Sequence, residues 1–147
     1  MNNIDEVLED ARHFPEMGGK VVEKLWGKEF IICRAPHAAK IMVMDPDTQV
    51  SLHWHKDKSE TFILIEGELV VETIDTKTGE TIPVNLYSKF SSITLQPNTP
   101  HTFYCPEGQI GPTVFIEAST EDRDDDSYRI FPSQGKEDPD NRGSNSR

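Results

Sequence analysis

The chain has 147 residues, 35% of them hydrophobic, which suits one domain with its own core and is short for two. Its net charge of −11 disfavours nucleic acid as a partner and repels anionic substrates unless a local basic group offsets the field. No apolar run approaches the ~20 residues of a membrane-spanning helix, and the acidic start is unlike a secretory signal, so we expect a cytoplasmic protein with two reduced cysteines and no membrane partner.

Apolar residues in residues 2–14 recur at helical spacing and predict a short amphipathic helix within a lead-in over residues 1–19. From residue 20 the pattern changes to short runs rich in Val, Ile, Phe and Thr, separated by turn residues. The predicted strands are 29–33, 40–44, 50–55, 61–65, 69–74, 81–86, 92–95, 101–104 and 113–118, with a last strand or turn at 127–131. We therefore predict an all-β barrel or sandwich over residues 20–131, then a disordered polar tail over 132–147.

Four side chains form a candidate metal site. His53 and His55 are separated by one residue on a predicted strand, so both side chains point to the same face. Glu60 follows a short loop at the start of the next strand, and His101 follows the turn 96–100. A single strand histidine is more often an ordinary residue, but this combination supplies the donors that divalent first-row metals prefer. We expect one divalent ion (Mn, Zn, Fe, Ni or Co).

The spacing His53-Trp-His55-(four residues)-Glu60-(six residues)-Gly67 resembles the first motif of the cupin superfamily, and residues 97–101 are similar to its second motif. The second motif is degraded: Phe90, Gln96, Asn98 and Cys105 replace the usual residues, and Asp47 replaces the glycine that opens the first. Asn and Asp tolerate left-handed backbone best among non-glycine residues, so Asn98 and Asp47 can keep their turns. The resemblance implies the cupin double-stranded β-helix, a jelly-roll barrel, holding a metal at His53, His55, Glu60 and His101. Because single-domain cupins commonly pair through sheet edges, it also implies a homodimer.

Residues 22–29 (VEKLWGKE) resemble a segment of the mannose-6-phosphate isomerase-like cupins, the type II phosphomannose isomerase C-terminal branch, with Leu25 in place of proline. This resemblance implies a small-molecule substrate and carbohydrate metabolism. It also implies a sugar or sugar-phosphate isomerase or epimerase of the aldose–ketose type, with the metal as Lewis acid.

Two residues are candidates for catalysis. Glu117 shares a strand face with Thr113 and Phe115, so its carboxylate would point into the barrel if that face is the interior. Lys40 shares a face with Met42 and Met44 and would be an interior cation. Arg129 is a weaker candidate that requires the chain end to fold over the mouth. The sequence shows neither a clustered basic pair nor a glycine-rich helix start, which favours a polyol in general over a phosphorylated sugar.

Two other function classes fit the same ligands. Three histidines and a glutamate also suit Fe(II) in a non-haem dioxygenase, for which Met42, Met44, Phe62, Leu64 and Phe103 would supply an apolar pocket. A non-catalytic cupin that binds a metal or a ligand is the third class, and closed coordination would favour it.

Overall fold

The computed structural model describes residues 19–135, and the predicted N-terminal helix lies outside them. Strands are listed here in chain order: β1 (Lys20–Lys24), β2 (Gly27–Cys33), β3 (His37–Met44), β4 (Leu52–Trp54), β5 (Glu60–Glu66), β6 (Leu69–Ile74), β7 (Thr81–Leu86), β8 (Ser92–Leu95), β9 (His101–Tyr104), β10 (Thr113–Thr120) and β11 (Tyr128–Phe131). A 3-10 turn, η3 (Asp124–Asp126), precedes β11. Within the described range, no helix is long and apolar enough to cross a membrane.

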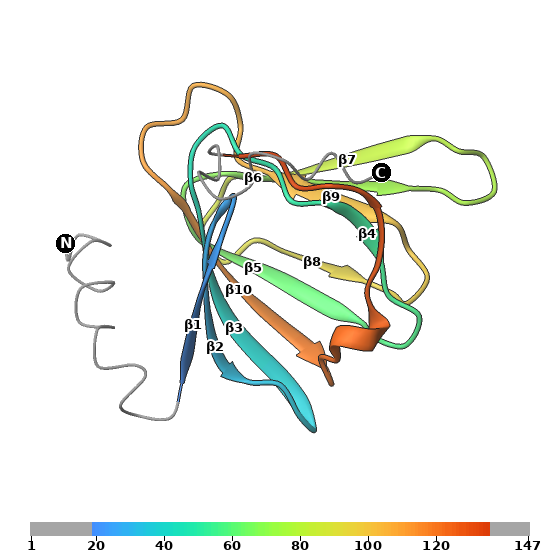
Figure 1. Ribbon diagram of the computed structural model, residues 1–147. Helices are drawn as coiled ribbons and strands as arrows, with labels where there is room; N and C mark the ends of the chain where they lie inside the picture. The colour runs from blue at the N-terminus through green and yellow to red at the C-terminus, as the bar shows by residue number, and fades with distance from the viewer. Residues whose placement is uncertain (1–18, 136–147) are drawn as a thin grey trace, which may run out of the picture.

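The strands form two antiparallel sheets that face each other (Figure 1). The six-stranded sheet has the order β1-β2-β3-β10-β5-β8, and the five-stranded sheet has the order β11-β4-β9-β6-β7. One end strand of each sheet, β1 or β11, lines a pocket that lies between the sheets. The jelly-roll prediction is confirmed, because the chain is nearly all β and its two sheets enclose one core.

Alternation along the strands places the core between the sheets. On β5, Phe62 and Leu64 are buried at period two with Glu60. Phe103 on β9 and Phe115 on β10 pack edge-to-face with a centroid distance of 5.4 Å, and Phe62 lies 4.9 Å from Phe103. This aromatic cluster fills the barrel behind the polar site and fixes the strands that carry it.

Left-handed backbone occurs at three of the motif positions that depart from the family pattern. Asp47 has φ of 58° and Asn98 has φ of 62°, as expected for residues that replace glycine. Phe90 also adopts φ of 68°, with its ring exposed to solvent. Gly67 has φ of 78°, and a Cβ there would lie 2.9 Å from Thr113 Oγ1, so the glycine of the first motif is required by both conformation and space.

Two features differ from the prediction in detail. Strand β1 was not predicted, because Lys20–Lys24 has three lysines or glutamates among five residues and shows no clean alternation. Gln134, which was assigned to the polar tail, instead pairs with Gln49: each backbone N–H donates to the other residue's carbonyl, at 2.8 and 2.9 Å. The chain after β11 therefore continues along the five-stranded sheet at least to this pair.

Candidate metal centre and its pocket

The four side chains of the candidate metal site converge inside the domain. His53 lies on β4, His55 directly follows it, His101 begins β9 and Glu60 begins β5. One ligand atom from each residue lies within 4.8 Å of the others. The strand register explains part of this arrangement, because His53 is directly opposite His101 and opposite residues share a face. The structure thus brings together every residue that the sequence assigned to the metal.

Each histidine is oriented by a backbone carbonyl. His53 Nδ1 donates to the carbonyl oxygen of Ser51 at 2.7 Å, and His55 Nδ1 donates to that of Asp126 at 2.6 Å. His101 Nδ1 donates to the carbonyl oxygen of Thr99 at 2.8 Å. A carbonyl only accepts, so the proton of each neutral imidazole is on Nδ1 and a lone pair is on Nε2. Such outer hydrogen bonds are the usual support of metal-bound histidines.

The atoms at the centre have no hydrogen-bond partner among the described residues: His55 Nε2, His101 Nε2 and Glu60 Oε1. His55 Nε2 lies 3.6 Å from Glu60 Oε1, and His101 Nε2 lies 2.6 Å from it, but neither pair forms a hydrogen bond. Lone pairs that face each other in a buried site repel, and a divalent cation between them would satisfy all of them. With metal–donor bonds of about 2.0–2.2 Å, the donor set fits one divalent ion.

Burial favours the neutral form of two of the histidines, His53 and His55. Burial, together with the neighbouring His101, lowers the pKa of His53 to about 3. Burial and the charge of Lys58 lower the pKa of His55 below its usual value. Metal binding requires the unprotonated ring, so the lowered pKa values of His53 and His55 keep protons from competing with a metal at these two donors.

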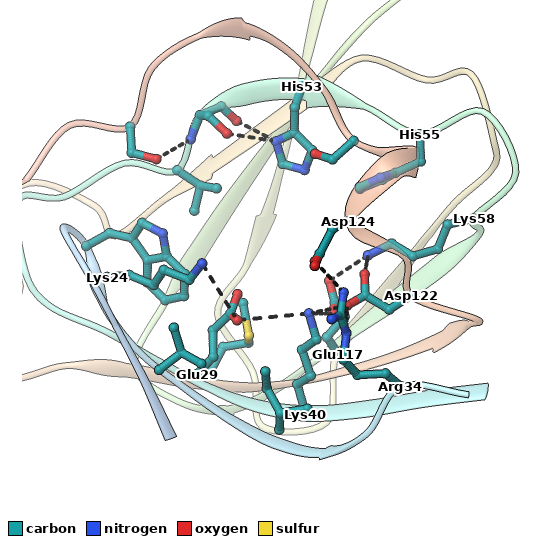
Figure 2. A pocket seen from close by; sticks show the side chains of 18 of the residues that line it. Lys24, Glu29, Arg34, Lys40, His53, His55, Lys58, Glu117, Asp122 and Asp124 are labelled. Carbon is teal, nitrogen blue, oxygen red and sulfur yellow. Dashed lines mark hydrogen bonds and ion pairs between the residues drawn. The ribbon is translucent and has the colours of Figure 1, made fainter. Parts of the chain in front are cut away.

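Lys58, which the sequence analysis missed, lies beside the metal centre (Figure 2). Its Nζ atom lies 3.1 Å from Glu60 Oε2, 3.1 Å from Asp122 Oδ1 and 3.6 Å from Glu117 Oε1. Burial opposes its charge, but these carboxylates outweigh burial and raise the pKa of Lys58 above its usual value. A signal for it was present, because Lys58 precedes Glu60 by two residues and period-two spacing would place both on one face.

Glu117 and Lys40 lie together in the same buried cluster. They are directly opposite each other in the β10–β3 pair, and Lys40 Nζ lies 3.6 Å from Glu117 Oε2 and 2.9 Å from Asp122 Oδ2. Burial and the adjacent Glu60 carboxylate raise the pKa of Glu117 to about 8. Glu117 Oε2 has no hydrogen-bond partner among the described residues. Both residues therefore face the interior, as their strand patterns predicted.

The acidic run 121–126 is of a kind that more often lies in solvent, but here it packs against the loop between His55 and Glu60. Asp126 is 3% exposed, and its carboxylate accepts hydrogen bonds from the backbone N–H groups of Lys56, Asp57 and Lys58 at 2.8–3.2 Å. These contacts join segments about 70 residues apart in the chain, so the charge pattern alone gave no sign of them. They fix the loop between His55 and Glu60.

Asp122 makes the stability of this cluster pH-dependent. Although burial opposes ionisation, the charges of Lys58 and Lys40 hold the pKa of Asp122 well below its usual range. A carboxyl group with a depressed folded-state pKa stabilises the fold above its unfolded pKa of about 3.9, and loses this effect as the pH falls further. Asp122→Asn should therefore be less stable than wild type at pH 7, by about 1–3 kcal/mol.

The measurement is urea unfolding of both proteins from about pH 7 down to about pH 2.5. The difference in free energy of unfolding should shrink below about pH 4, whereas Glu80→Gln, in the exposed β6–β7 turn, should follow wild type throughout. A difference that stays constant with pH would contradict the role of the Asp122 charge.

A pocket of about 400 Å³ opens beside the metal centre, between the two sheets. In Figure 2, His53 and His55 lie along one wall, and Lys40, Glu117 and Asp122 lie on the facing wall. Apolar side chains such as Trp26 and Phe103 also line it, but most of its lining residues are polar or charged. This combination is typical of a site that binds a small polar molecule next to a metal.

Comparison with known proteins supports the fold. CapF, a capsular polysaccharide assembling protein from Staphylococcus aureus, has a TM-score of 0.68 at 18% identity, over 77% of this chain and 34% of that chain. An oxalate decarboxylase from Lactobacillus farciminis has a TM-score of 0.65 at 16% identity, over 78% of this chain and 34% of that one. A Bacillus subtilis oxalate decarboxylase, described with Mn(II) centres, has a TM-score of 0.65 at 16% identity, over 78% and 31%.

The chain spans about a third of the length of these three structures. No curated protein matches its sequence. Residues 40–117 match the Cupin_2 family, described as a cupin domain. This range runs from one candidate catalytic residue to the other and includes all four metal donors. Since that match covers more than half of the sequence and the two-sheet barrel agrees with it, this chain belongs to the cupin family.

Proposed function

We propose that this cupin is a metal-dependent enzyme that isomerises or epimerises a sugar or a sugar derivative by removing a proton from the carbon next to a carbonyl group and returning a proton to the neighbouring or to the same carbon. One observation carries the proposal: the carboxyl group of Glu117 is buried and lines the same pocket as His53 and His55. Its Oε2 atom has no hydrogen-bond partner among the described residues. A buried carboxyl group with a free oxygen beside a metal site is suited to general acid–base catalysis.

The residues have distinct roles in this mechanism. A divalent metal held by His53, His55, Glu60 and His101 would polarise a carbonyl oxygen of the substrate as a Lewis acid. Glu117 takes the proton from the carbon next to the carbonyl. In an isomerisation it returns this proton to the former carbonyl carbon, while the proton of the neighbouring hydroxyl group passes to the former carbonyl oxygen; in an epimerisation a proton returns to the same carbon from its other face. A carboxyl group whose pKa is raised toward neutral pH suits both transfers.

Lys40 provides the opposing charge. Its Nζ atom lies 3.6 Å from Glu117 Oε2, and its side chain is buried. While the substrate carbon has lost its proton, negative charge develops in the pocket, and a fixed ammonium group stabilises it. Lys40 is therefore proposed to stabilise charge rather than to transfer a proton.

Two likenesses support a carbohydrate substrate. Residues 22–29 resemble the mannose-6-phosphate isomerase-like branch, and in the structure they place Trp26 and Glu29 in the pocket lining. The similar CapF structure belongs to a capsular polysaccharide assembling protein. The dioxygenase alternative expects a mainly apolar pocket, whereas charged groups such as Lys40, Lys58 and Asp122 line this one. The homodimer and the cytoplasmic location stay predictions.

The proposal is tested with the protein purified without a metal-affinity tag or chelator. Its metal content is measured by mass spectrometry, and the metal-loaded protein is incubated in D₂O with a panel of aldoses, ketoses, their phosphates and sugar acids. We expect interconversion of one substrate pair, with solvent deuterium appearing on the carbon next to the carbonyl. One equivalent of iron with oxygen uptake would overturn the proposal in favour of the oxygenase. Tight metal binding with neither reaction would leave a binding module.

A further inference from the structure

The charge of the pocket is opposite to the charge of the chain. Seven of the chain's 15 lysines and arginines line the pocket, against four of its 26 aspartates and glutamates. A site that binds neutral molecules needs no such concentration of cations, which costs free energy through mutual repulsion. The excess indicates a ligand that carries negative charge.

The inner cations are already neutralised by protein carboxylates. Lys40 and Lys58 share Asp122, at 2.9 and 3.1 Å, and Lys58 also pairs with Glu60 at 3.1 Å. Arg34 pairs with Asp122 at 3.0 Å. Nearer the surface, Arg123 pairs with Asp57 at 2.8 Å. These ion pairs hold residues 122 and 123 against the loop that carries Asp57 and Lys58, and they leave little positive charge for a permanently charged group of a ligand.

Two cations at the pocket lining have no ion-pair partner among residues 19–135. Lys20 begins β1 and Arg129 lies on β11, and both side chains are exposed. Lys24 adds a third charge on β1, held only loosely by Glu29 at 4.0 Å. In Figure 2 Lys24 lies on the opposite side of the pocket from the Lys58–Asp122 cluster. Positive charge is thus available on the two end strands, away from the buried pairs.

The strand registers show how Arg129 relates to the metal centre. Arg129 is directly opposite His53 in the β11–β4 pair, and His53 is directly opposite His101 in the β4–β9 pair. Opposite residues in antiparallel strands share a face, so the three side chains form one row on the inner face of the five-stranded sheet. Neighbouring strands lie about 4.8 Å apart, which places Arg129 one strand from a metal ligand.

A corresponding row crosses the six-stranded sheet. Lys20 is opposite Ile31, Ile31 is opposite Lys40, and Lys40 is opposite Glu117. This row therefore runs from a free cation on the end strand to the proposed proton-transfer residue. Both rows have their free cation on an end strand and their reactive group toward the interior.

From this arrangement we infer that the substrate carries an oxyanion group, a phosphate or a carboxylate, which Arg129 binds while the rest of the molecule reaches His53 and Glu117. Lys20 adds a further positive charge to the lining of the same pocket. The position of the reacting end rests on the proposed function. Arg129 is suited to this task because its planar guanidinium binds carboxylate or phosphate through two parallel hydrogen bonds. The net negative charge of the chain repels anions, and Arg129 provides a positive charge at the pocket that offsets this repulsion locally.

The test uses the zinc-loaded, isotope-labelled protein, titrated by NMR with inorganic phosphate, acetate and neutral glucose. We expect saturable shifts at the backbone amides around Arg129 with phosphate, with acetate or with both, and the comparison tells which oxyanion is preferred. Arg129→Gln should weaken this binding roughly tenfold, because it removes a charge-assisted contact at an exposed position that the fold does not need. Lys77→Gln, in the exposed β6–β7 turn outside the pocket lining, is the matched control and should bind as wild type does.

A second arm separates this inference from the proposed function. In Glu60→Ala, which loses a metal donor, oxyanion binding at Arg129 should persist and should weaken as NaCl rises from about 50 to about 500 mM. Binding without turnover of any sugar would uphold the inference and count against the isomerase. Turnover of neutral sugars with no preference for phosphates or sugar acids would overturn the inference and uphold the isomerase. Anion binding that is equal in wild type and Arg129→Gln would also overturn it.

Discussion

Glu117→Gln should abolish deuterium exchange and interconversion of the substrate, with kcat lowered about 10²–10⁴-fold, while one equivalent of metal stays bound. Glutamine keeps the shape of the side chain and its place between Lys40 and Lys58, but it cannot take a proton. Since Glu117 lies next to Glu60 without being a metal donor, the variant separates proton transfer from metal binding. The measurement is turnover in D₂O together with metal content.

The matched control is Glu66→Gln, at the exposed end of neighbouring β5. It should keep the activity of wild type. A Glu117→Gln protein that keeps more than about a tenth of the wild-type kcat would show that another group moves the proton.

The pH dependence of its stability tests whether Glu117→Gln loses activity through misfolding. The pKa of Glu117 is raised to about 8 in the folded state, so ionising this group opposes folding. The metal-free wild type should therefore lose stability relative to Glu117→Gln as the pH rises from about 4.3, the unfolded pKa, to about 8, after which the difference should level off. Thermal unfolding of both proteins across this range measures it. A variant that is less stable than wild type at pH 8 would contradict this explanation.

The metal donors could be predicted from the sequence because local rules place them. His53 and His55 share a face through period-two alternation, and the same rule sets Glu60 in line with the buried Phe62. His101 was a candidate because it follows the turn 96–100, and the family resemblance strengthened it; its position opposite His53 comes from the β4–β9 pairing rather than from any local pattern. Burial of Glu117 and Lys40 also followed from the apolar neighbours on their strand faces.

The surroundings of the metal site could not be predicted, because they depend on contacts between distant segments. Asp126 holds the ligand loop through hydrogen bonds across about 70 residues of sequence, and an acidic run more often lies in solvent. Arg129 and Lys20 lie more than 100 residues apart, so the sequence showed no basic pair although both line one pocket. Strand alternation predicts which face a residue is on, whereas tertiary pairing decides which charges meet there.

His55→Ala and Glu60→Ala should each abolish tight metal binding and leave a folded barrel. The three Nε2 lone pairs and the Glu60 carboxylate provide all four donors, and loss of one leaves too few to hold a divalent ion at a stoichiometric level. The fold should survive, because the aromatic core behind the site is untouched and Lys58 keeps Asp122 as a partner at 3.1 Å. Metal content by mass spectrometry and circular dichroism measure the two effects.

Thermal unfolding gives an independent measure of metal binding. A ligand that binds only the folded state raises stability by about 2.7 kcal/mol at a hundred times its Kd, so added metal should raise the Tm of wild type. The same addition should leave the Tm of His55→Ala and Glu60→Ala nearly unchanged, while His37→Ala, which alters an exposed histidine on β3, should respond as wild type does. If both site variants keep one equivalent of metal and the full rise in Tm, the ion is bound elsewhere and the site assigned to these four residues is wrong.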